Sequence, residues 1–141
     1  TIKGAVETVA TGSHSGTILT CDTATATVFT HDLQSGTVGI VSITNFPATS
    51  ASFHTITLLL KQNDAGTAHT TSNTGIQTVT VTPTGVAGFT TTPLVGSGTT
   101  LTLGTTANDE NFVTLGIHYN GGTNTSHDSY KVFITKNGDF R

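Results

Sequence analysis

The chain has 141 residues, of which only 9% are charged, and a formal net charge of −3 at pH 7; this length predicts a single domain over residues 1–141. Threonine, which is β-branched and fits a pleated strand, makes up roughly a quarter of the chain, so the composition predicts an all-β fold. The five Lys and Arg residues are too few for a nucleic-acid partner, and the longest largely apolar run, Ile56 to Leu60, is too short for a membrane span of roughly 18 residues.

Alternation of polar and apolar residues recurs along the chain with turn residues between the runs, which is typical of a sandwich or barrel. We predict an antiparallel β-sandwich of the jelly-roll type with about eight or nine short strands. The strands are expected at residues 5–11, 17–21, 25–31, 39–45, 54–61, 77–82, 99–103, 111–118 and 129–135. Residues 84–100 show no clear period, so a loop or a surface arm is expected there.

The strands predicted at 54–61 and 129–135 carry apolar side chains on both faces. Leu59 alternates with the apolar positions 56, 58 and 60, and Phe133 alternates with the apolar positions 130, 132 and 134. In a lone subunit the second face of each strand would expose an apolar patch. We therefore expect self-association, with Leu59, Lys131, Phe133 and Arg141 as interface residues.

Turn residues follow three of the predicted strands, at positions 63–66, 120–122 and 137–138. Asn, Asp and Gly tolerate the positive φ that a tight reversal requires. We expect a reversal at each position, and the Asn137-Gly138 pair is expected to end the last strand.

Two segments contain the residue types of a hydrolase. Ser13-His14-Ser15 would supply a nucleophile, and His127-Asp128 a base with its orienting carboxylate. No G-x-S-x-G motif accompanies them, and both segments have the composition of polar turns. We expect these side chains to cap strand ends, and we expect no enzyme and no catalytic residue.

Metal and cofactor motifs are not found in the sequence. None of the six histidines is spaced as H-x-H or H-x-x-x-H, and the EF-hand spacing of carboxylates is absent. The Gly-rich stretch near position 98 lacks the Lys of a phosphate-binding loop. We expect no metal and no cofactor, although a symmetric trimer would bring one His of each copy together on its axis.

The aromatic residues leave one binding function open. Tyr119 and Tyr130 are the candidates for a sugar-stacking face, since β-sandwiches often present sugars in their loops. The competing interpretation is that both rings shield strand ends while their hydroxyl groups stay hydrated.

Three segments of the chain carry a family resemblance: GTILTCDTATATVFTHDL, VGIVSITNFPATSASFHTITLLLKQNDAG and FVTLGIHYNGGTNTSHDSYKVFITKNGDFR. Together they resemble small β domains of virion proteins of tailed bacteriophages, particularly marine and cyanobacterial phages, and residues 84–109 match least. The resemblance implies a non-enzymatic capsid decoration (cement) protein or fibre module on the virion. It also implies a homotrimer whose further partner is the major capsid protein or a neighbouring virion protein. The alternative is a carbohydrate- or receptor-binding module of a phage fibre.

Overall fold

The computed structural model describes residues 7–33, 38–47, 50–62, 76–85, 88–95, 101, 103–104, 108–121 and 130–140, with residues 138–140 described by their backbone alone. Eleven strands are found in these residues, and the all-β prediction is confirmed. Their bounds are β1 Val9–Thr11, β2 Ser13–Ser15, β3 Ile18–Asp22, β4 Val28–Asp32, β5 Ile40–Phe46, β6 Ser52–Lys61, β7 Thr78–Pro83, β8 Phe89–Thr91, β9 Leu94–Val95, β10 Glu110–Tyr119 and β11 Tyr130–Phe140. In the described part of the chain there is no helix of the length and apolarity needed to cross a bilayer.

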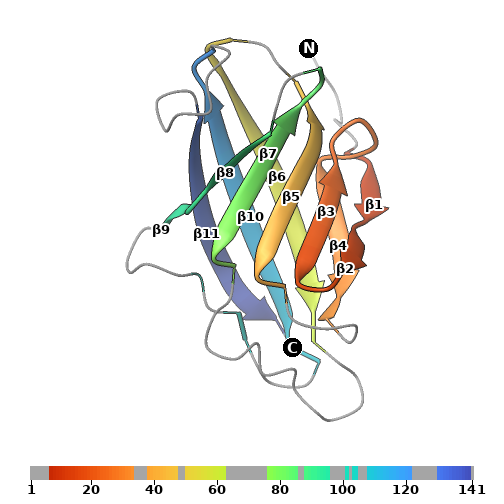
Figure 1. Cartoon of the computed structure of the whole chain (residues 1–141). Helices are drawn as coiled ribbons and strands as arrows, with labels where there is room; N and C mark the ends of the chain where they lie inside the picture. The colour runs from red at the N-terminus through yellow and green to blue at the C-terminus, as the bar shows by residue number, and fades with distance from the viewer. Residues whose placement is uncertain are drawn as a thin grey trace, which may run out of the picture.

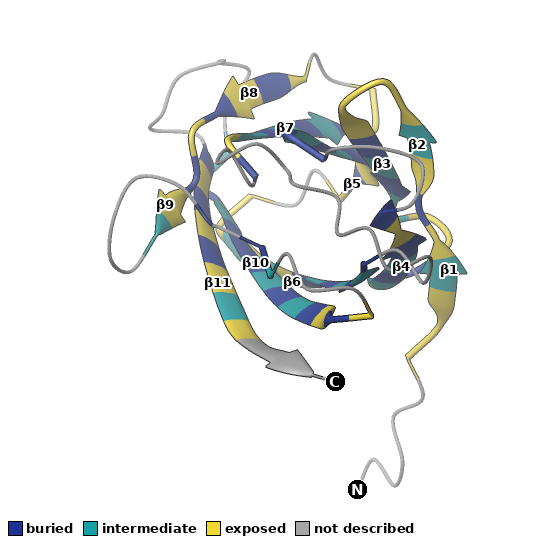
Figure 2. Cartoon of the chain, turned by 90° about the horizontal axis from the view of Figure 1, so that it is seen from below, coloured by how far each residue is buried: buried dark blue, intermediate teal, exposed yellow. Residues whose placement is uncertain are grey.

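The strands form two sheets that face each other (Figure 1). The six-stranded sheet has the order β1-β4-β6-β10-β11-β9, and the five-stranded sheet has the order β2-β3-β5-β7-β8. Viewed along the strands, the buried residues line the space between the two sheets (Figure 2). Among the described residues, no further strand layer covers the outer face of the six-stranded sheet.

The predicted antiparallel pairing is wrong, because both sheets are mixed. Strands β3, β5 and β7 pair in parallel in one sheet, and β1, β4 and β6 pair in parallel in the other. Between β3 and β7, successive strands alternate between the two sheets, so each strand lies beside the one that comes two positions later and runs in the same direction. Period-2 patterning shows which residues face the core, but it carries no information about the neighbouring strand. The finer prediction of a jelly roll is not confirmed by these pairings.

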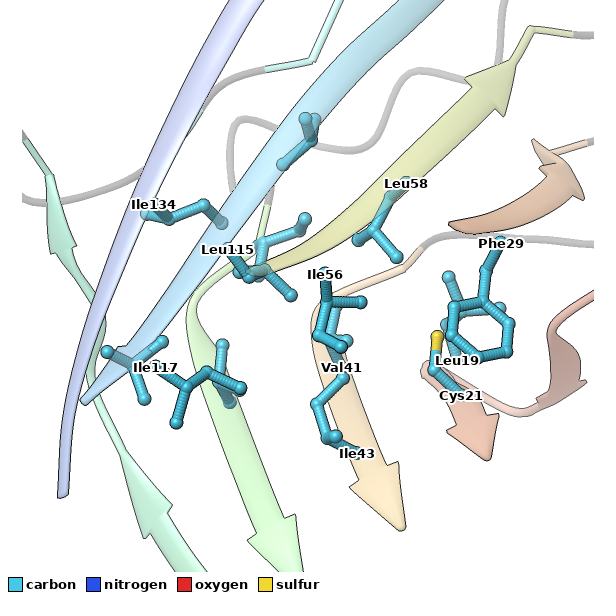
Figure 3. Packing of buried hydrophobic residues seen from close by; sticks show 14 of the residues in the cluster. Leu19, Cys21, Phe29, Val41, Ile43, Ile56, Leu58, Leu115, Ile117 and Ile134 are labelled. Carbon is cyan, nitrogen blue, oxygen red and sulfur yellow. The ribbon is translucent and has the colours of Figure 1, made fainter. Parts of the chain in front are cut away.

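The core is built by the inward faces that the alternation predicts. Figure 3 shows aliphatic side chains of β6 and β10 directed toward those of β5 and β3: Ile56, Leu58, Leu115 and Ile117 on one side, and Val41, Ile43, Leu19 and Cys21 on the other. All of these side chains are at most 2% exposed. Burial raises the pKa of the Cys21 thiol to about 12.

Two segments differ from the sequence prediction. Residues 84–100, expected as a loop or arm, contain the short strands β8 and β9. The last strand does not end at Asn137-Gly138 but continues to Phe140, and its register against β10 shifts at this point. The Asn-Gly pair thus forms a β-bulge, in which one extra residue is accommodated, rather than a turn. Of the strand expected at 99–103, the structure describes Leu101 and Leu103, and Leu101 bridges Ile76.

Candidate association surface

Apolar side chains gather on the outer face of the six-stranded sheet. In the described part of the chain, five large hydrophobic side chains are exposed: Val9, Ile18, Phe53, Leu94 and Phe133. Four of the five lie on strands of the six-stranded sheet, and Ile18 alone lies on the other sheet. Their strand registers place these four on the outward side, opposite the core positions of the same strands. The exposed apolar residues are therefore concentrated on one face.

Phe53 lies over a glycine on the neighbouring strand. In the register, Phe53 of β6 is paired with His118, and Gly116 of β10 is paired with Thr55. The Phe53 ring reaches diagonally to Gly116, because a Cβ atom built there would lie 2.6 Å from its Cζ atom. Gly116 is itself buried, whereas Phe53 is 60% exposed. The Cζ end of the ring thus occupies the space above Gly116, while much of the ring remains exposed to solvent.

Phe133 and Leu94 continue this apolar surface toward the sheet edge. Gly116 is directly opposite Phe133 of β11, and Phe133 is directly opposite Leu94 of β9. Phe133 is 40% exposed and Leu94 is 54% exposed. We call Phe53, Phe133 and Leu94, grouped around Gly116, the outer apolar cluster.

The polar positions around the outer apolar cluster are mostly hydroxyl groups. Thr57, Thr114 and Thr135 form the next row across the sheet, and Asn137 donates a hydrogen bond from Nδ2 to Oγ1 of Thr114 over 3.0 Å. Lys131 is exposed at the end of the face that carries Phe53. Threonine loses less hydration free energy on burial than a charged side chain, so this surface is easier to cover than an ionic one.

Leu59 lies on the same outer face, nearer its opposite end. It is half-buried and lies directly opposite Phe112 of β10. Leu59 also lines a hollow of about 380 Å³ together with Thr11, Thr30, His31, Asp32, Lys61 and Glu110. In this hollow the register places Lys61 between the acidic residues of β4 and β10. Of the remaining interface candidates, Lys131 is exposed as described above, and Arg141 lies outside the described residues.

Tyr119 and Tyr130, the candidates for a sugar-stacking face, lie in the core. They are 4% and 3% exposed, and their rings stack with centroids 4.6 Å apart. Phe89 also stacks on Tyr130 at 5.7 Å. Burial above all, and then the neighbouring Tyr119, raise the pKa of Tyr130 to about 12. A sugar stacks on an exposed ring face, so the positions of these two rings do not support glycan binding.

The hydrolase candidates do not come together in the described part of the chain. Ser13 and Ser15 are exposed on β2, and His127-Asp128 lies outside the described residues. The ring that packs against His14 is that of His31 on β4, with centroids 4.9 Å apart. Burial lowers the pKa of His31, as does the charge of His14, while Asp32 acts in the opposite direction. Within the described residues, no group of three or more His, Cys, Asp or Glu side chains is arranged to hold a metal ion.

Sequence reasoning missed three members of this surface. Leu94 fell in the segment expected as a loop, and Gly116 carries no side chain to indicate a face. Phe53 lay just outside the strand expected at 54–61, although the alternation that includes Leu59 extends back to it. Following that alternation one residue further would have placed Phe53 on the outer face.

The chain was also compared with known proteins. No protein-family model matches it, and neither do the curated proteins or the solved structures.

Proposed function

We propose that the chain is a non-enzymatic structural module that associates with copies of itself and serves as a decoration (cement) or fibre protein of a phage virion. The outer apolar cluster is the observation that carries this proposal. Its three large side chains are 40 to 60% exposed around one glycine on a single sheet face. Removing such a surface from water contributes about 25 cal/mol for each Å² of apolar area.

A second copy of this chain is the proposed occupant of the surface, because the two ends of the face are complementary to each other in charge. Its charged residues lie toward its two ends: Lys131 near the outer apolar cluster, and Asp32, Lys61 and Glu110 at the hollow beside Leu59. A head-to-tail contact brings the Lys131 end of one copy toward the acidic residues of the next. Head-to-tail contacts close into rings, and the resemblance to trimeric phage domains favours three copies.

The virion role is supported by the resemblance of three long sequence segments to small β domains of tailed-phage proteins. Such a role needs rigid packing and association but no turnover. The further partner proposed on this basis is the major capsid protein or a neighbouring virion protein.

Replacing the two phenylalanines tests the association surface. The variant Phe53→Ser with Phe133→Thr keeps the core strands and removes both aromatic rings of the outer apolar cluster, and Ile18→Thr is the matched control on the opposite sheet. Light scattering after size exclusion is expected to show association of the wild type and the control, with at least tenfold weaker association of the double variant. Association of the double variant at wild-type strength, with its fold retained, would contradict the proposal.

A further inference from the structure

A half-buried and a buried imidazole ring, those of His14 and His31, meet between the two sheets at one side of the sandwich. His14 belongs to β2 of the five-stranded sheet, and His31 belongs to β4 of the six-stranded sheet. Their ring centroids are 4.9 Å apart, and His31 is only 7% exposed. They lie 17 positions apart in the sequence, so the fold brings them together and no local motif indicates the pair.

The backbone holds this pair in place through a tight corner. The chain passes from β1 in one sheet to β2 in the other at Gly12, whose N–H donates to the carbonyl of Thr30 over 2.9 Å. A Cβ atom on Gly12 would lie 2.6 Å from Cδ1 of Leu19, so only glycine fits this corner without displacing that side chain. Thr30 directly precedes His31, and Gly12 lies two residues before His14. The corner therefore fixes the strand positions from which both rings project.

The Nε2 atoms of both rings are buried without a hydrogen-bond partner among the described residues. Burying a polar nitrogen without a hydrogen-bond partner costs free energy. Two such nitrogens on adjacent rings therefore call for an explanation. A neutral imidazole nitrogen carries a lone pair and is the most common protein ligand for transition metals. Nitrogens bound to one ion at ~2.1 Å lie about 3 to 4 Å apart. Ring centroids at 4.9 Å are compatible with that spacing.

We propose that His14 and His31 form a two-nitrogen binding site for a divalent first-row transition-metal ion that links the two sheets. Imidazole suits zinc, copper, iron and nickel, and Cu²⁺ binds nitrogen ligands most tightly in this series. Water completes the coordination, since no third metal-binding side chain is grouped with the pair in the described part of the chain. The ion binds the folded pair more tightly than the unfolded chain, so it stabilises the fold. This site lies between the sheets and is independent of the outer apolar cluster.

Titration of chelator-treated, untagged protein with Cu²⁺ tests the site. The wild type is expected to bind one Cu²⁺ per chain, with nitrogen coupling in the electron paramagnetic resonance spectrum. Its melting temperature is expected to rise by roughly 5 to 10 °C at a hundredfold excess over Kd. His14→Gln and His31→Gln are each expected to weaken binding at least tenfold, and the matched control His118→Gln on the outer face is expected to bind as the wild type does.

A second measurement decides the matter if either variant fails to fold. Zn²⁺ added to the wild type is expected to shift the imidazole NMR signals of His14 and His31 and to leave that of His118 unchanged. The inference is overturned by no saturable Cu²⁺ binding, by wild-type affinity in both single variants, or by Zn²⁺ shifts that are absent or centred on His118.

Discussion

Phe53 covers Gly116 across the pair of strands β6 and β10, at a distance that leaves no room for a side chain at the glycine. The glycine leaves room for the Cζ end of the Phe53 ring above the strand, on the face that also carries Phe133. Such pairing of an aromatic ring with a strand glycine also shields a backbone that would otherwise be open to water. The shape of the outer apolar cluster therefore depends on a residue that contributes no apolar side chain of its own.

Substitution of the glycine is expected to separate association from folding. In Gly116→Ala the new methyl group displaces the Phe53 ring, which has free space on its solvent side. We expect self-association to weaken at least tenfold, which corresponds to about 1.4 kcal/mol. The free energy of unfolding of the monomer should change by less than about 1 kcal/mol, because alanine relieves the entropic cost of glycine in a strand. Dilution in an analytical ultracentrifuge together with denaturant unfolding measures both quantities, and unchanged association would show that the ring position is unimportant.

Alternation predicted the inward and outward faces of the long strands correctly. Ile56 and Leu58 lie in the core as expected, and Phe133 faces outward as expected. The partner of each strand could not be predicted in the same way, because strands two apart in sequence pair in parallel while the intervening strand joins the other sheet. Pairing depends on long-range packing, and a local pattern does not encode it.

The surroundings of the candidate site residues also depend on long-range packing, which the local sequence pattern does not encode. Tyr119 and Tyr130 occupy inward positions of β10 and β11, so alternation with their neighbours already indicated burial, yet their hydroxyl groups suggested a surface role. His14 and His31 lie on different sheets, and only the fold shows that their rings are in contact. The Asn137-Gly138 pair had the composition of a turn, but the pairing of β11 with β10 continues through it.

Asp22 is expected to stabilise the corner between β3 and the following turn. Its Oδ1 atom accepts hydrogen bonds from the Ala24 N–H at 3.0 Å and from Nδ2 of Asn45 at 2.8 Å. Asn45 has a φ of 52°, so its conformation benefits from this contact. Asp22→Ala should lower the free energy of unfolding by roughly 1 to 2 kcal/mol in urea denaturation. Asp22→Asn, which retains an acceptor oxygen, should recover most of the loss; equal losses in both variants would argue against this role.

The Cys21 thiol is expected to be unreactive in the folded chain. It is fully buried, and burial raises its pKa to about 12, so almost no thiolate forms near neutral pH. A thiol-specific disulfide reagent should modify Cys21 only after denaturation. Ser13→Cys in a Cys21→Ala background is the positive control, because position 13 is exposed. Rapid modification of native Cys21 would contradict the burial described above.

The buried His31 is expected to make the fold sensitive to mild acid. Its pKa in the folded chain lies below the usual 6.5, so the unfolded chain binds the proton more readily. The contribution of His31 is therefore fully present above about pH 6.5 and decreases as the pH falls below that value toward the folded pKa. The charged form of His14 adds to this effect, and Asp32 opposes it. With a chelator present, the drop in unfolding free energy between about pH 7 and 5 should be smaller in His31→Gln than in the wild type or His118→Gln. The same drop in all three proteins would refute the assignment.

Sedimentation equilibrium of the wild-type chain over a wide concentration range tests the central claim most directly. If the outer face of the six-stranded sheet is covered by other copies of the chain, the mass should approach three times the 14.5 kDa of one chain as concentration rises. A single species of 14.5 kDa at every concentration would contradict the account.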